Sequence, residues 1–150
     1  FPHHTNIASG HQVLGGKLAV TPTTPHRLGK KHRFALVGGS IYSPARELAR
    51  FAEMLMERGS LGAKVFMSSD SWQQMTSPQS RRKTGPYGLG LGLKGESGDD
   101  EMVAYSHGGS LSGFISYVAV DLRTRRFAVI NYTGPRQPQI TAALLTWVSP

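Results

Sequence analysis

The chain has 150 residues, of which 39% are hydrophobic, and it contains no Cys. This length and composition are ordinary for one globular domain with a packed core, and they exclude a disordered tail, disulfide bridges and thiolate metal sites. A count of 17 basic against 9 acidic residues gives a net charge of +8, which raises the hypothesis of a non-catalytic binding module for nucleic acid or an anionic polymer.

Three features of the sequence bear on the extent of the protein and on its compartment: the first residue, the length of the apolar runs and the absence of Cys. The chain opens on Phe1 rather than Met, so we expect it to be part of a longer protein. No uninterrupted apolar run approaches the roughly 20 residues that a membrane helix needs, so no membrane span is expected. Because there is no Cys, the redox compartment stays open, and so does the localisation.

Residues 1–37 are rich in Gly, Pro, Thr and His and show little periodicity. We predict that they form an irregular segment that wraps the domain, with residues 38–150 supplying the ordered part. The neighbouring His3 and His4, with His11 further on, could suggest a metal site. They lack the helical i, i+4 spacing and the nearby carboxylates of such a site, so no metal is expected.

Order is predicted to begin with a helix over about residues 44–58. Ser43 is a good N-cap, Pro44 suits the first helical position, and Gly59 supplies a stop. Four residues at helical spacing make one face apolar: Leu48, Phe51, Ala52 and Leu55.

The stretch "SPQSRRKTG" at residues 77–85 matches two motifs of serine hydrolases that recognise penicillin, S-x-x-K and K-T-G. In that chemistry Ser and Lys lie one helical turn apart, and a second cation stands across the cleft. Here both motifs share Lys83, and Pro78 and Gly85 lie on either side of Ser80 and Lys83. We therefore interpret this stretch as a solvated loop and the double match as a coincidence of composition.

The next segments read as glycine-rich strands. "YGLGLGLKG" at residues 87–95 resembles a phosphate loop, but no helix start follows it, so a strand is favoured. Residues 95–101, "GESGDDE", are predicted to form a surface loop, and "MVAYSHGG" at residues 102–109 rises from it as another strand.

The most strand-like segment covers residues 113–132. Residues 114–120 are apolar on both faces, which predicts a strand covered on both sides. Residues 121–125 form the loop of a hairpin, and residues 127–132 return as its second strand. A final helix follows, which we expect to pack on the sheet through one apolar face: Ile140, Ala143, Leu144, Trp147 and Val148.

A second pattern, Gly109-Ser110-Leu111-Ser112-Gly113, fits the G-x-S-x-G nucleophile elbow with Ser112 as the nucleophile. That elbow requires a strand, a sharp turn and then a helix. A strand is predicted to follow here, and the chain is short for an α/β-hydrolase, so we do not favour this interpretation.

The basic residues lie mainly in three short groups, at residues 26–33, 81–83 and 123–126. They fall in predicted loops and lack the interleaved aromatic side chains of a base-stacking platform. Solvated loops are therefore favoured over a nucleic-acid surface.

Three motifs in order carry a family resemblance: "GGSIYSPARELARFAEML" at residues 38–55, "YGLGLGL" at 87–93, and "YSHGGSLSGFISYVAVDLRTRRFAVINYT" at 105–133. Over residues 5–148 the chain resembles the C-terminal half of the serine β-lactamase and penicillin-binding-protein-like superfamily, especially its class C β-lactamase and esterase branch. The resemblance implies an α+β fold whose antiparallel sheet contributes its C-terminal three strands here, with packed helices. The first strands and most of the helical domain are expected to be absent.

The resemblance also implies site residues. His107-Gly108-Gly109 resembles the third family motif, with His in place of Lys, on a strand edge that faces substrate. By this match His107 and Ser110 are catalytic, the backbone N–H of Ser110 acting as an oxyanion-hole donor. Four neighbours are then expected to contact substrate: Gly108, Gly109, Leu111 and Ser112.

The catalytic Ser and Lys of S-x-x-K and the Tyr-x-Asn motif are not found in the chain. We expect an N-terminal portion to carry them, either as another chain after cleavage or lost, and this segment alone to be inactive. The implied function is a serine hydrolase that forms an acyl-enzyme with an ester, a β-lactam or a peptide-like amide. No metal or organic cofactor is implied. The basic binding module stays open as the alternative.

Overall fold

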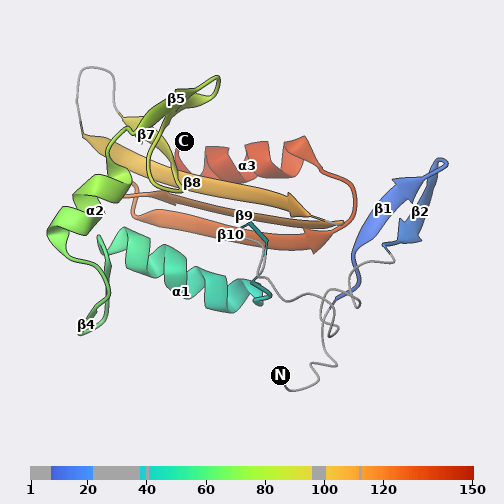
Figure 1. Cartoon of the computed structure of the whole chain (residues 1–150), viewed down its shortest axis with the longest axis horizontal. Helices are drawn as coiled ribbons and strands as arrows, with labels where there is room; N and C mark the ends of the chain where they lie inside the picture. The colour runs from blue at the N-terminus through green and yellow to red at the C-terminus, as the bar shows by residue number, and fades with distance from the viewer. Residues whose placement is uncertain (1–7, 22–37, 40, 96–100, 112) are drawn as a thin grey trace.

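The computed structural model describes residues 8–21, 38–39, 41–95, 101–111 and 113–150. A pair of strands precedes each of the first two helices, and six strands then follow in succession before the last helix (Figure 1). The helices are α1 (Ala45–Met56), α2 (Ser69–Thr76) and α3 (Pro138–Val148). The strands are β1 (His11–Leu14), β2 (Lys17–Val20), β3 (Ser60–Leu61), β4 (Lys64–Val65), β5 (Ser80–Arg82), β6 (Gly85–Tyr87), β7 (Gly92–Gly95), β8 (Met102–Leu111), β9 (Phe114–Asp121) and β10 (Arg126–Thr133).

Six strands form one antiparallel sheet in the order β10-β9-β8-β7-β6-β5. The three C-terminal strands are the long ones and pair over most of their length, from Ala104↔Asp121 to Leu111↔Phe114 and from Arg126↔Asp121 to Thr133↔Phe114. The predicted α+β class and the predicted hairpin around residues 121–125 are therefore confirmed.

The sheet is covered on both faces, as the apolar pattern of residues 114–120 predicts. α1 lies on one face and α3 on the other (Figure 1). Val118 and Val120 belong to the core cluster that includes Ala52 and Leu55 of α1. On the α3 side Val148 is 1% exposed. Because alternate residues of a strand point to opposite faces, an apolar run of this length needs both helices.

Helix α1 begins one residue after its predicted start and ends two residues before its predicted end. The N-cap is Pro44, not Ser43, and no side chain caps the helix. Ser43 lies one residue too early and donates its hydroxyl to the Pro44 carbonyl instead. At the other end Gly59, with φ 97°, donates its N–H to the Met54 carbonyl at 2.8 Å and ends the helix.

The prediction that residues 1–37 are irregular is wrong for residues 11–20, which form a hairpin. β1 and β2 pair from His11↔Val20 to Leu14↔Lys17, around Gly15 and Gly16 with φ of 57° and 79°. Two successive positive φ values match the right-handed strand twist, and glycine adopts them without strain. Residues 22–37 lie outside the described part of the chain.

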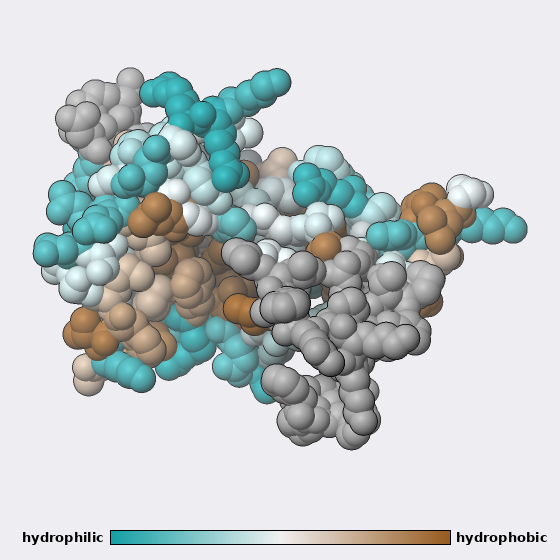
Figure 2. Space-filling model, in the orientation of Figure 1, coloured by the Kyte–Doolittle hydropathy of each residue, from teal (hydrophilic) through white to brown (hydrophobic). Residues whose placement is uncertain are grey.

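The hairpin carries exposed apolar side chains, seen at the right of Figure 2. Those at least half exposed are Val13, Leu14, Leu18 and Val20. Its contacts to the sheet are polar: the His11 N–H donates to the Gly113 carbonyl at 3.3 Å, and the His11 Nδ1 lies 3.1 Å from the Thr133 hydroxyl.

Helix α2 is an element that the sequence analysis does not predict. The Ser68 hydroxyl caps it by accepting from the Ser71 N–H at 3.2 Å. Its anchor is Trp72, whose ring meets the Tyr105 ring edge to face with centroids 5.4 Å apart. With only Trp72 and Met75 as large apolar side chains over two turns, the segment shows too little periodicity to be detected.

Asp121 joins the end of β9 to the end of α3. Its side chain is fully buried and accepts from the backbone N–H groups of Arg123 and Thr124 at 2.9 and 3.1 Å. The Ser149 hydroxyl and the Arg123 guanidinium also donate to it. Burial by itself raises the pKa of Asp121, but the hydrogen bonds from Ser149, Arg123 and Thr124 outweigh it and hold the pKa below the ordinary 3.8.

Candidate active site

Strand β8 is paired differently along its two sides. On the β9 side its register runs without a break from Ala104 to Leu111. On the β7 side the register ends at Gly92↔Ser106. Within the described residues, the segment from His107 to Leu111 therefore has one side without a neighbouring strand, and residues 107–110 are exposed.

The backbone groups on that free side follow from the register. The Leu122 N–H donates to the Val103 carbonyl at 2.9 Å, so Val103 directs its backbone groups to β9. In an antiparallel ladder this direction alternates from residue to residue. Gly108 and Ser110 therefore direct their N–H and carbonyl groups away from β9, toward the free side. This is the direction that the predicted role of Ser110 requires.

His107 stands at the start of the free segment and has one side-chain partner in the described part of the chain. Its Nδ1 lies 3.0 Å from the hydroxyl of Tyr87 on β6. The guanidinium of Arg82 lies over the Tyr87 ring, 3.4 Å from the centroid. The motif "YGLG" by itself predicts no role for Tyr87. The two residues are 20 positions apart, and no spacing rule connects them.

The two glycines after His107 differ in their surroundings. A Cβ built on Gly108 would lie 2.5 Å from the Tyr117 ring, so Gly108 allows Tyr117 to pack across β8. A Cβ on Gly109 would meet nothing within 4 Å. Leu111 packs against Gly39, and Ser112 lies outside the described residues.

Comparison with known families gives a match over nearly the whole chain. A family model described as Beta-lactamase matches residues 6–147. The chain belongs to the beta-lactamase family. It is thereby placed in the serine β-lactamase and penicillin-binding-protein-like superfamily, and its three helices and six-stranded sheet agree with a partial fold of that type. No curated protein and no solved structure matches the chain.

In this beta-lactamase family chain, the S-x-x-K and K-T-G matches do not form a site. Ser80 to Arg82 make strand β5, which corrects the predicted loop, and Ser80 lies opposite Tyr87. A strand cannot bring Ser80 and Lys83 together as one helical turn does. Strands β5 and β6 form a hairpin. Its β5 strand is solvent-exposed, and the hairpin forms the hydrophilic projection at the top of Figure 2.

The G-x-S-x-G match also lacks its required context. Strand β9 begins at Phe114, directly after Gly113, so a strand follows the pattern as predicted. An elbow needs a helix there.

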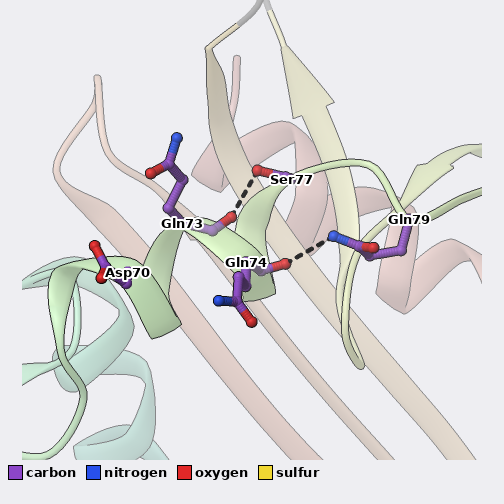
Figure 3. A pocket seen from close by; sticks show the side chains of 5 residues that line it. All are labelled: Asp70, Gln73, Gln74, Ser77 and Gln79. Carbon is purple, nitrogen blue, oxygen red and sulfur yellow. Dashed lines mark hydrogen bonds between the residues drawn. The ribbon is translucent and has the colours of Figure 1, made fainter.

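One hollow of the described surface does not include His107 in its lining. It measures about 370 Å³ and is lined by Asp70, Gln73, Gln74, Ser77 and Gln79, between α2 and the start of β5 (Figure 3). Two of these side chains bond backbone carbonyls of α2, Ser77 to Gln73 at 2.6 Å and Gln79 to Gln74 at 3.1 Å. The hollow is polar and open and holds no nucleophile next to a base.

The basic groups of the described residues are largely used within the fold. Arg123 bonds Asp121, Arg125 bonds Glu57 at 2.5 Å, and Arg126 donates to the Trp147 carbonyl at 3.0 Å. The group at residues 26–33 lies outside the described part. Among the described residues no cluster of His, Asp and Glu could hold a metal ion, and no helix is long and apolar enough to cross a membrane.

Proposed function

We propose that the complete protein is a serine hydrolase that forms an acyl-enzyme, and that this chain supplies one wall of its cleft. The observation that carries the proposal is the free side of β8 from His107 to Leu111, in a chain of the beta-lactamase family. Substrates would be an ester, a β-lactam or a peptide-like amide. His107 in place of Lys favours the esterase-like members of the class C and esterase branch.

The free side supports an electrostatic role for the backbone. A serine hydroxyl attacks the substrate carbonyl carbon, and negative charge builds on the carbonyl oxygen until the bond to the leaving group breaks. The leaving group then takes the proton that the serine hydroxyl lost in the attack. The Ser110 N–H, directed away from β9, would donate to that oxygen as a fixed dipole. Gly108, Gly109, Leu111 and Ser112 would border the acyl group.

The nucleophile is proposed to come from an N-terminal portion of the same protein that carries S-x-x-K and Tyr-x-Asn. Two features support this. β10 is an edge of the sheet and has only β9 beside it in the described part of the chain. On α3, Leu145 and Trp147 are 39% and 55% exposed, as expected of a helix that another segment covers. Residues 1–150 would then be the C-terminal portion of one domain.

Turnover of nitrocefin and of p-nitrophenyl esters by the full-length protein tests the proposal. We expect His107→Ala to lower kcat/KM by about 10²-fold or more, the usual contribution of a group that moves or holds a proton in the transition state. His11→Ala is the matched control, because the His11 ring bonds Thr133 instead. Turnover unchanged by His107→Ala would contradict the role of His107. Steeply salt-dependent binding to nucleic acid, without turnover, would favour the basic binding module.

A further inference from the structure

The imidazole of His107 is held from a strand that is not its neighbour. Tyr87 lies on β6, and β7 stands between β6 and β8. Tyr87 pairs with Gly92, and Gly92 pairs with Ser106, where the β7 register ends. Gly92 has no side chain, and the Tyr87 ring passes beside it, 4.0 Å from the position of a Cβ. The Tyr87 hydroxyl thereby reaches the His107 Nδ1 at the first residue beyond β7.

Arg82 holds the ring of Tyr87. Ser80 lies opposite Tyr87, and Arg82, two residues along β5, is on the same face of the sheet as Ser80. Its guanidinium stacks on the ring at 3.4 Å from the centroid, well within cation–π range. A cation over the ring draws electron density from the phenol and favours the hydroxyl as a hydrogen-bond donor.

A neutral imidazole carries one proton, and the hydrogen bond at one ring nitrogen decides which nitrogen holds it. A donor at Nδ1 leaves the proton on Nε2. We propose that Tyr87, braced by Arg82, is the positioning residue of His107, fixing the orientation of its ring and keeping its proton on Nε2. The ring edge that carries Nε2 is then left to act on a substrate.

This inference rests on the proposed function for its catalytic meaning, and it gives the stretch "SRRK" a role that neither serine-hydrolase motif provides. The role belongs to one residue of the three basic ones. Arg81 pairs with Pro86 and, one residue from Arg82, points to the opposite face. Arg81 therefore offers a control with the same charge, also exposed, on the face of the sheet opposite to Arg82.

The state of the His107 ring can be read without any substrate. Long-range proton–nitrogen correlation spectra of the ¹⁵N-labelled full-length protein report which ring nitrogen is protonated. We expect His107 to be protonated on Nε2 alone in the wild type when the ring is neutral, and to exchange between both forms in Tyr87→Phe. A wild-type ring protonated on Nδ1, or a His107 signal unaltered by Tyr87→Phe, would overturn the proposal.

Kinetics of the full-length protein supply the second readout. We expect Tyr87→Phe, which keeps the ring and loses only the hydroxyl, to lower kcat about tenfold with little change in KM, the size of effect that misorientation produces. Arg82→Ala should lower kcat by less, and should cause no further loss in the Tyr87→Phe background, because Arg82 acts through Tyr87. Arg81→Ala should match the wild type.

The outcomes separate this inference from the proposed function. If His107→Ala abolishes turnover while Tyr87→Phe leaves kcat unchanged, the positioning role is wrong and the hydrolase proposal stands. If His107→Ala has no effect on turnover, the role of His107 in the proposed function is wrong, and the spectra still decide whether Tyr87 holds the ring. Equal losses from Arg81→Ala and Arg82→Ala would overturn the bracing by Arg82.

Discussion

The two halves of strand β8 contrast sharply. The inner half, residues 102–106, has β7 on one side and β9 on the other and holds Tyr105, which is 3% exposed. The outer half, residues 107–111, has β9 alone, and its first four residues are exposed. Burial raises the pKa of the Tyr105 phenol above the ordinary 10.0. His107, two residues further along the strand, is exposed.

The contrast shows how one strand combines stability with an accessible site. Residues 104–106 of the inner half pair with both β7 and β9, so the outer half has a defined position as the continuation of the same strand. Its free side results from the end of the β7 register at Ser106, and of its two glycines Gly108 makes room for the Tyr117 ring. A rigid element with one end bare gives a more exact placement of functional groups than a loop does.

The largest effect on stability is expected from removing the buried Tyr105 side chain of the inner half. Tyr105→Ala removes a buried ring from its contact with Trp72 and should lower the free energy of unfolding by about 4 kcal/mol. Tyr105→Phe keeps the ring and loses the hydroxyl, which donates to the Met102 carbonyl, and should cost about 1 kcal/mol. Urea unfolding of the full-length protein measures both. Equal costs would show that the hydroxyl, not the ring, stabilises this half.

The next effect concerns Asp121, which lies opposite Ala104 of the inner half. Asp121→Asn should lower the free energy of unfolding by about 3 kcal/mol near neutral pH, because a buried charged acceptor of several hydrogen bonds is lost. Its folded-state pKa lies below 3.8, so the carboxylate contributes fully above that value and loses its contribution as the pH falls through the folded pKa.

Unfolding curves between about pH 6 and pH 3 check the sign. The difference in the free energy of unfolding between the wild type and Asp121→Asn should shrink as the pH falls. A constant difference between the two proteins across this range would mean that Asp121 does not titrate with folding.

The smallest effect separates the two glycines of the outer half. Gly108→Ala places a methyl group 2.5 Å from the Tyr117 ring and should cost about 1 kcal/mol, the low end for overpacking, since the ring is only partly buried. Gly109→Ala meets open space and should stay within about 0.5 kcal/mol of the wild type. Thermal unfolding distinguishes them. A larger loss of stability for Gly109→Ala than for Gly108→Ala would indicate that another segment of the full-length protein covers Gly109.

Much of the fold is predictable where the pattern is local and long. The strands around residues 121–125 and helix α1 end within two residues of their predicted bounds. Short elements were missed. The β1–β2 hairpin was signalled only by Gly15 and Gly16, and α2 only by Trp72 and its cap, signals that many loops share.

By itself, the sequence determined the order of the motifs, the family that they indicate and the two-sided burial of β9, because these are properties of neighbouring residues and of their period. Only the tertiary structure decided where β7 ends and which phenol meets His107. Those features depend on contacts between strands far apart along the chain, such as Tyr87 and His107, which no local period encodes. The family motif marked the strand, and the packing of its neighbours exposed one side of it.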